Sequence, residues 1–334
     1  MSVRKSVLLS AFCVFVLALC VGSVRSEAAA KYKMKYAGVG SDTHPNSRTA
    51  AELAEFLAEK SGGELEMTVF RNAALGGDRQ VTEGMQIGTV ELGVVGSSVL
   101  VAFEPKVGVL DFPFIFKTEE AAYKALDGEV GDIIRELLLK KGLRVLAYGT
   151  NGYRHVTNSR NPIRKPEDLK GLKIRTMENP IFVEMFKLMG ASPTPMSFSE
   201  LFTALQQKTV DAQENPILLI YSSKLYEAQK YISKTGHVYA VAPLLMSETF
   251  FQSLPEEHQK IVLEGGKFFE KRQRELMHEN EESFETAMKE AGIEVNELTS
   301  EEKDEFIKVC QEVYSKFEAS VGRDLLDKAI AAND

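Results

Sequence analysis

Beyond residue 30, the hydrophobic positions of the chain follow two spacings in turn. Segments in which every second residue is apolar predict β-strands, and segments with apolar residues three and four positions apart predict helices. The first strand shows the pattern clearly, because Tyr32, Met34 and Tyr36 would share one of its faces. The two spacings alternate along most of the chain, which predicts an α/β fold around a largely parallel sheet.

Capping and turn residues separate the predicted elements. Asn46 or Ser47 can cap the first helix, and Gly62 with Gly63 would end it. Strands are predicted at 31–40, 65–70, 90–95, 143–148, 153–159, 172–176 and 210–211. Further helices are predicted at 78–87, 119–126, 131–141, 180–189, 198–207, 256–291, 300–320 and 323–332.

The helix predicted over residues 256–291 is longer than most helices of globular proteins, which average about 10–14 residues. Gly265 and Gly266 would allow a kink within it. The chain has 334 residues, a length typical of two domains, and no low-complexity linker divides it. We therefore expect two domains that are joined by several short crossings and spanned by this helix.

The first 30 residues differ from the rest of the chain. Arg4 and Lys5 precede an almost uninterrupted apolar run from residue 7 to residue 24, and three alanines follow at 28–30. This order is typical of a cleavable secretory signal peptide, which we predict over residues 1–30. An uncleaved membrane anchor is the alternative, because the run approaches the length that spans a bilayer. No later run approaches that length, so the mature protein is not expected to span a membrane.

The use of cysteine agrees with export. Lipid attachment at Cys20 is disfavoured, because Leu19 stands where such sites require a small residue. Removal of residues 1–30 would take away two of the three cysteines and leave Cys310 alone. A single cysteine cannot form an internal disulfide, and it avoids mispairing in an oxidising compartment.

Composition and charge narrow the class of protein. Hydrophobic residues make up 44% of the chain and charged residues 26%, which is ordinary for a globular protein and excludes a disordered chain, a collagen-like fibre and a polytopic membrane protein. Forty Lys and Arg residues stand against 48 Asp and Glu residues, for a formal net charge of −8. A general nucleic-acid-binding protein needs a basic surface, so no nucleic-acid partner is expected.

Signatures of catalysis are missing from the sequence. It contains no G-x-S-x-G elbow, no Walker phosphate loop, no G-x-G-x-x-G after the first strand and no H-E-x-x-H. His278 has glutamates close by, but it lies on the long polar helix, where such a cluster is typical of a solvated face. Cys310 lies in an amphipathic helix and fits a small core residue. We therefore predict no enzymatic activity, no metal-ligating residues and no cofactor.

Three polar residues stand where a ligand could bind. Arg175 ends a strand with apolar neighbours, and ligands of open α/β sheets bind beyond the carboxyl ends of strands. Its guanidinium can hold a carboxylate through two hydrogen bonds, although an ion pair with Glu178 explains the position equally well. Arg154 begins a predicted strand after a turn at 151–152. Asn215 has an amide that both donates and accepts, but Asn-Pro turn chemistry is the favoured interpretation from the residues alone.

Short motifs in a fixed order carry a resemblance to a known family. In the first half of the chain they are LGGDR at 75–79, LDFPF at 110–114 and GYR at 152–154. In the second half they are LKIR at 172–175, GASPTPM at 190–196, FSE at 198–200, ALQ at 204–206 and VDAQENP at 210–216. Together they resemble the extracytoplasmic substrate-binding proteins of TRAP transporters, the DctP-like family. The resemblance covers about residues 31–330.

This resemblance implies a two-lobed, periplasmic-binding-protein-like α/β fold with hinge strands and a long spanning helix, which closes on its ligand. Lobe I would comprise residues 31–151 plus 242–280. Lobe II would comprise residues 152–241 plus 281–330.

The resemblance also implies the residues of the substrate site. In lobe II, Arg175 would bind the substrate carboxylate, Arg154 would add a second contact, Asn215 would orient the ligand and Phe198 would pack on it.

The match in lobe I is looser. His44, Asp78 and Ser97 fall near contact positions that vary with the substrate in this family. Some relatives have an acidic side chain where this chain has Gly96 or Ser97, which puts an amino-sugar-acid ligand in doubt. His44 and the two serines at 97–98 favour a polyhydroxylated acid slightly over an apolar one.

The function implied is the periplasmic capture of a small organic acid and its delivery to the membrane permease subunits of a TRAP transporter. A sugar acid, a C4-dicarboxylate or a related acid would satisfy an arginine clamp. The protein is expected to act as a monomer. A sensory protein that presents its ligand to a membrane receptor is the alternative function.

Overall fold

The computed structural model describes residues 30–334, and nearly all of the segment predicted as a signal peptide lies outside this range. Its strands form one continuous mixed sheet, in the order β2-β1-β3-β9-β4-β7-β5-β6, and β8 and β10 extend it from β4. The strands are β1 (Tyr32–Ala37), β2 (Leu65–Phe70), β3 (Leu92–Val94), β4 (Leu143–Asn158), β5 (Lys173–Thr176), β6 (Ser192–Pro195), β7 (Ala212–Pro216), β8 (Tyr231–Lys234), β9 (Tyr239–Ser247) and β10 (Glu294–Glu297).

The direction of the strands divides the sheet into two halves. The pairs β1–β2 and β1–β3 are parallel on one side, and β5–β6 and β5–β7 are parallel on the other. The centre differs from the predicted parallel sheet, because β9 and β4 pair antiparallel with each other and with their outer neighbours β3 and β7. All nine residues of β9 are buried. The strand therefore lacks the alternation of apolar and polar residues by which strands were predicted, and it was not predicted from the sequence.

Strand β4 corrects another prediction. The two strands expected at 143–148 and 153–159 form a single strand of 16 residues. The predicted turn at 151–152 is a bulge, where the register of β4 against β9 shifts between Thr150 and Gly152. Gly152 has φ +81°, a conformation that glycine adopts readily, so the strand continues through it. Both halves of the sheet therefore share β4.

Helices and 3₁₀ turns cover the sheet on both faces. They are α2 (Pro45–Lys60), α3 (Asp78–Ile87), α4 (Ser97–Leu100), η1 (Pro105–Asp111), α5 (Glu119–Leu126), α6 (Glu129–Leu139), η2 (Pro166–Leu169), α7 (Pro180–Leu188), α8 (Phe198–Gln206), α9 (Ile217–Ser222), η3 (Leu225–Ala228), α10 (Glu248–Ser253), α11 (Glu256–Glu290), α12 (Ser300–Val321) and α13 (Arg323–Ala331). Helix α2 begins earlier than predicted, because its N-cap is His44 and Pro45 takes the first helical position.

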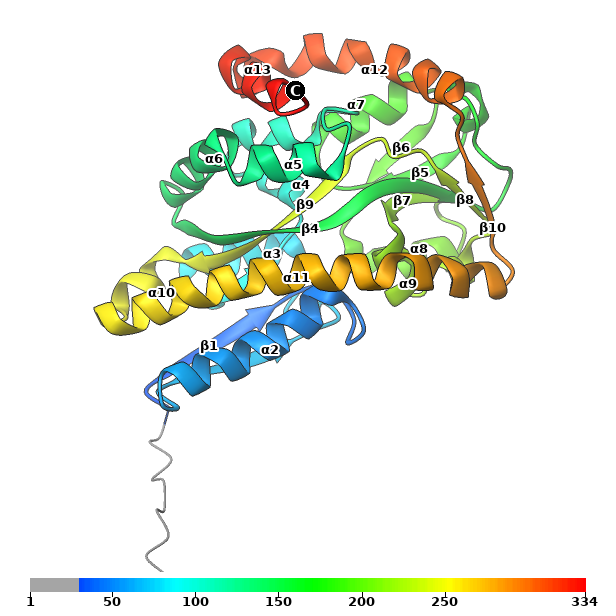
Figure 1. Ribbon diagram of the computed structural model, residues 1–334. Coiled ribbons are helices and arrows are strands. Elements are labelled where there is room, and N and C mark those ends of the chain that lie inside the picture. Colours follow the sequence, from blue (N-terminus) through cyan, green and yellow to red (C-terminus); the bar gives the residue numbers. More distant parts are fainter. Residues whose placement is uncertain (1–29) are drawn as a thin grey trace, which may run out of the picture.

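The long helix α11 runs along both halves of the sheet (Figure 1). It packs against α2 and β4 in the first half and against α9 in the second. A Cβ on Gly266 would lie 2.6 Å from the carbonyl oxygen of Leu146, and a Cβ on Gly265 would lie 2.9 Å from Leu53 Cδ1. The two glycines thus allow close packing of α11, which continues through them as one helix of 35 residues.

Three hydrophobic clusters form the core. One lies between the first half of the sheet, α2 and α11, and another lies between α8, α9, β8 and the end of α11. The largest joins η1, α5 and α6 to α7 and α12, and it includes the buried Cys310. Because α12 packs against both η1 and α7, and α13 against α6 and η1, the C-terminal helices connect the two halves. The lobe boundaries given above stay a prediction. Within residues 30–334, no helix is both long and apolar enough to cross a membrane.

Candidate functional site

A cavity lies between the two halves of the sheet, and polar and apolar side chains of both halves line it. Its walls come from the segments that follow β1, β2, β3, β5 and β6, and from β4 and β7 between them. Six of the seven residues predicted for the site line it, namely His44, Asp78, Arg154, Arg175, Phe198 and Asn215. Ser97 is buried at the start of α4 and does not line the cavity, whereas its neighbour Gly96 does.

Arg175 is buried and forms no ion pair with an acidic side chain in the described part of the chain, although the charges of Glu214, Asp78 and Glu178 favour its charged form. It is 2% exposed, and its Nε and Nη2 donate to the carbonyl oxygen of Met196 at 2.9 and 2.6 Å. Its Nη1 is buried without a hydrogen-bond partner. Burial lowers the pKa of Arg175 to about 10, so the group remains charged at neutral pH. The predicted alternative of an ion pair with Glu178 is therefore wrong for this conformation.

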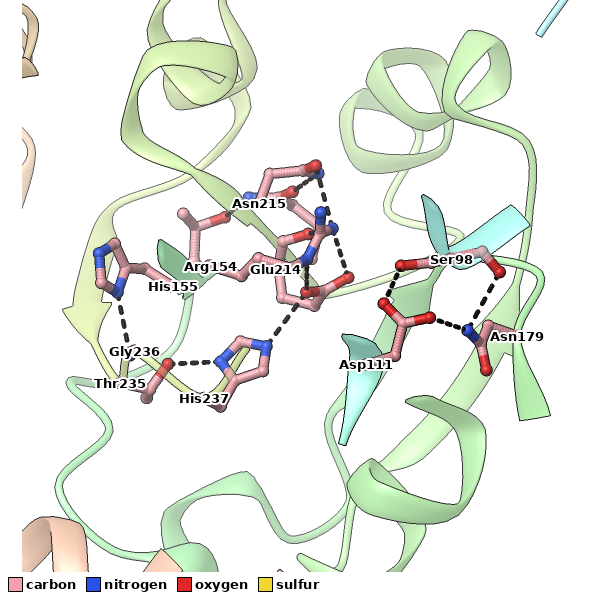
Figure 2. A network of polar contacts seen from close by, with 12 residues as sticks. Ser98, Asp111, Arg154, His155, Asn179, Glu214, Asn215, Thr235, Gly236 and His237 are labelled. Carbon is pink, nitrogen blue, oxygen red and sulfur yellow. Dashed lines mark hydrogen bonds and ion pairs between the residues drawn. The ribbon is translucent and has the colours of Figure 1, made fainter. Parts of the chain in front are cut away.

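Arg154 differs from Arg175, because a buried carboxylate already neutralises it (Figure 2). Its Nε and Nη2 donate to the two carboxylate oxygens of Glu214 at 2.5 and 2.8 Å. Burial alone would raise the pKa of Glu214, but the charge of Arg154 and a hydrogen bond from His237 outweigh it and hold that pKa below its ordinary value. His237 Nε2 lies 3.1 Å from Glu214, and Thr235 contacts the other ring nitrogen at 2.8 Å. No sequence pattern indicates a role for Glu214 or His237, because 23 positions separate them.

Asn215 lies within β7, so its predicted turn role is wrong. Its Oδ1 accepts from Arg154 at 3.1 Å, and its Nδ2 donates to Gln213 at 2.5 Å. Phe198 begins α8, and the guanidinium carbon of Arg175 lies 5.9 Å from the centre of its ring. Its ring can therefore cover the cavity beside the arginine.

His44 presents a hydrogen-bond donor to the opposite wall. It is the N-cap of α2, and its Nδ1 accepts from the backbone N–H of Asn46 at 3.2 Å. Burial lowers the pKa of His44 to about 4, so the ring is neutral at pH 7. Because Nδ1 accepts, the proton is assigned to Nε2, which is buried without a partner.

Asp78 presents an acceptor to the same wall. Its Oδ2 accepts from the backbone N–H of Gly96 at 2.9 Å, and its Oδ1 is buried without a partner. Burial raises the pKa of Asp78 to about 6, and the Gly96 hydrogen bond and the charge of Arg175 oppose the rise. At neutral pH the free oxygen can therefore accept a hydrogen bond from a ligand hydroxyl.

Tyr36 also lines the cavity, although its position in the hydrophobic pattern indicates only one face of a strand. Its hydroxyl is buried without a partner. A Cβ on Gly38 would lie 3.1 Å from this hydroxyl, and a Cβ on Gly40 would lie 3.0 Å from His44 Cβ. The two glycines that follow β1 thus leave room for Tyr36 and His44. The glycines at 38 and 40 are therefore the feature of the sequence that could have indicated a cavity here.

Metal-binding clusters are missing from the described residues: no group of three or more His, Cys, Asp or Glu side chains there could hold an ion. The lining instead offers one guanidinium with an unpartnered N–H group, donors from His44 and Tyr36, and an acceptor from Asp78. Such a set can hold a polar ligand by hydrogen bonds. The fold and cavity together define a two-lobed α/β solute-binding protein.

The chain belongs to the DctP family, bacterial extracellular solute-binding proteins of family 7, whose model matches residues 36–320. This is the family of TRAP transporter solute-binding proteins, and it is not a family of enzymes. The 2,3-diketo-L-gulonate-binding periplasmic protein YiaO of Escherichia coli is 38% identical over 284 residues, which cover 85% of this chain and 86% of YiaO.

Solved structures agree with this assignment. The sugar acid binding protein DctPAm of Advenella mimigardefordensis, in complex with galactonate, is 32% identical with a TM-score of 0.89, and the match covers 91% of this chain and 98% of DctPAm. A TRAP periplasmic solute-binding protein of Sulfurospirillum deleyianum with bound succinate is 31% identical with a TM-score of 0.87, and the match covers 91% and 99%.

Proposed function

We propose that this protein is exported to the periplasm, captures a small hydroxylated carboxylic acid there and delivers it as a monomer to the membrane permease of a TRAP transporter. The observation that carries the proposal is the buried Nη1 of Arg175. Arg175 lines the cavity among other polar side chains, yet this nitrogen has no hydrogen-bond partner. A buried charge without a partner is costly, and a ligand carboxylate would offset that cost. The periplasmic relative YiaO supports the location.

The opposite wall supports a ligand with hydroxyl groups. Asp78 Oδ1 accepts hydrogen bonds, and His44 Nε2 and the Tyr36 hydroxyl can donate them, so a hydroxyl group that both donates and accepts can satisfy this wall. A second ligand carboxylate near Asp78 would instead place two negative charges together. The galactonate complex of DctPAm is consistent with a sugar acid, and we favour this class over a plain dicarboxylate such as succinate. Neither the family match nor the relatives favour the sensory alternative.

Calorimetric titration tests this proposal with galactonate, galacturonate, erythronate and succinate as ligands. We expect at least one hydroxylated acid to bind more tightly than succinate, and we expect Arg175→Ala to remove most of that affinity. Tighter binding of succinate would overturn the preference for hydroxylated acids while leaving the carboxylate site intact. Native affinity in Arg175→Ala would overturn the site itself.

A further inference from the structure

A second buried polar cluster is drawn in Figure 2, and none of its residues lines the cavity. It consists of Ser98 in α4, Asp111 at the end of η1 and Asn179 immediately before α7. Ser98 and Asp111 belong to the segment that follows β3, and Asn179 belongs to the segment that follows β5. The cluster therefore joins the two halves of the sheet through side chains.

Each contact in the cluster is short and shielded from water. Ser98 Oγ donates to one Asp111 carboxylate oxygen at 2.6 Å, and Asn179 Nδ2 donates to the other at 2.8 Å. Asn179 Nδ2 also donates to the carbonyl oxygen of Ser98 at 3.0 Å. Asp111 and Asn179 are each 1% exposed. Burial raises the pKa of Asp111 to about 7, and the hydrogen bonds from Ser98 and Asn179 oppose this rise.

The cluster lies next in sequence to residues that do line the cavity. Gly96 and Val99 flank Ser98 on one wall, and Met177 and Glu178 precede Asn179 on the other. The walls touch beside it, because a Cβ on Gly96 would lie 2.9 Å from the Met177 methyl group. The distance between Asp111 and Asn179 is therefore coupled to the distance between the two walls.

We propose that Asp111 and Asn179 are positioning residues that bridge the two walls and set the affinity of the cavity without contacting the ligand. This bridge goes beyond the carboxylate site described above, and its contacts do not involve Arg175. Its hydrogen bonds hold the segment that carries Arg175 against the segment that carries Gly96, the backbone partner of Asp78. A ligand that contacts both walls binds most tightly when these are already in place.

Asn179 has a second role that the test must separate from the bridge. Its Oδ1 accepts from the backbone N–H of Ile181 at 2.8 Å and so caps α7. Asn179→Asp keeps a good capping group but replaces the donor to Asp111 with a carboxylate. Adding Asp111→Asn to Asn179→Asp restores one amide and one carboxylate. The amide at position 111 can then donate to the carboxylate at position 179. The bridge thus predicts a loss in the single variant and a recovery in the double variant.

The experiment measures two properties. Amide hydrogen exchange of segments 96–100 and 177–182 is followed in the protein without added acid, and affinity is measured by calorimetry for galactonate, galacturonate, erythronate and succinate. We expect Asn179→Asp to speed exchange in both segments and to weaken binding of the tightest of these acids by about tenfold, with little change in their rank order. The double variant, Asn179→Asp with Asp111→Asn, should recover most of the slow amide exchange in both segments and most of the affinity.

Asn158→Asp is the matched control. Asn158 is also a buried asparagine whose oxygen accepts backbone N–H groups, at Arg160 and Asn161, but its contacts stay within one half of the sheet. This variant should leave exchange in both segments unchanged. Native exchange in Asn179→Asp would overturn the bridge even if none of the four acids binds. The bridge would also be overturned if Asn158→Asp sped exchange in both segments as much as Asn179→Asp does. A double variant whose exchange stays as fast as in Asn179→Asp would overturn it too.

Discussion

Arg175 donates two hydrogen bonds to the backbone carbonyl oxygen of Met196, through Nε at 2.9 Å and Nη2 at 2.6 Å. A carbonyl fixes the orientation of the guanidinium plane without neutralising its charge. Arg154, in the same cavity, has its charge neutralised by Glu214. The two arginines therefore have different roles, and mutations should separate them.

Substitution of Arg175 should affect binding more than folding. Arg175→Ala should weaken binding of a carboxylic acid at least tenfold, because the loss of one partner of a buried charged pair typically costs about 2–5 kcal/mol. Arg175→Lys should restore binding in part, since an ammonium keeps the charge but not the planar geometry. Calorimetry measures both effects. Arg160→Ala is the control, because Arg160 pairs with Asp211 at the surface, and it should bind normally.

Substitution of Arg154 should affect folding first. Arg154→Met leaves the carboxylate of Glu214 buried without its main partner, which should lower the free energy of unfolding by about 3–5 kcal/mol. Urea unfolding without added acid measures this loss. Arg154→Met combined with Glu214→Gln should be less destabilised than Arg154→Met alone, because the uncompensated charge is then removed. A double variant that is less stable than the single one would contradict this account of the pair.

Tyr36→Phe should separate binding from stability. The Tyr36 hydroxyl is buried without a partner, so its removal should leave the melting temperature of the unliganded protein unchanged or higher. Affinity for the preferred hydroxylated acid should nevertheless fall by about threefold to tenfold, because a hydrogen bond to the ligand is lost. Tyr148→Phe is a matched control: that hydroxyl donates to Gly131 at 2.7 Å, so this variant should lose stability and keep its affinity.

Acid should destabilise the protein through His44. Its pKa is about 4 in the folded protein and about 6.5 in the unfolded chain, so the unfolded chain binds the proton first as the pH falls. The contribution of His44 to the free energy of unfolding should therefore decline from pH 6.5 towards pH 4, by about 2 kcal/mol at pH 5, since one pKa unit corresponds to about 1.4 kcal/mol. Urea unfolding of His44→Gln should show a smaller decline. His278→Gln is the surface control: it removes an exposed histidine that pairs with Glu119 at 3.0 Å, and it should leave the decline that depends on His44 in place.

Much of the fold could be predicted from the hydrophobic pattern, because most elements are buried on one face only. Helix α3 and strand β2 lie where the spacing places them, and α11 differs from its prediction by one residue. The pattern missed β9, since it is buried throughout, and it divided β4 at Gly152, whose bulge looks like a turn in sequence. These failures coincide with the two strands that join the halves of the sheet.

The site could be predicted less completely. Spacing alone could not decide between a ligand and Glu178 as the partner of Arg175, because that choice depends on where side chains lie in space. Tyr36 has the pattern of a core residue, and only its unpartnered hydroxyl distinguishes it. The contact of Asp111 with Asn179 joins residues 68 positions apart, and no local pattern indicates it.

The central position of β9 also constrains the order in which the molecule can be assembled. Strand β3 pairs with β9, and α2 packs against α11, so the half that contains the N-terminal strands needs residues up to Phe269 before its core is closed. The part of the chain that is synthesised first is therefore completed late. Contacts between such distant segments form slowly, which lengthens the time during which the chain is still unfolded. A chain that must cross a membrane before it folds would gain from this delay.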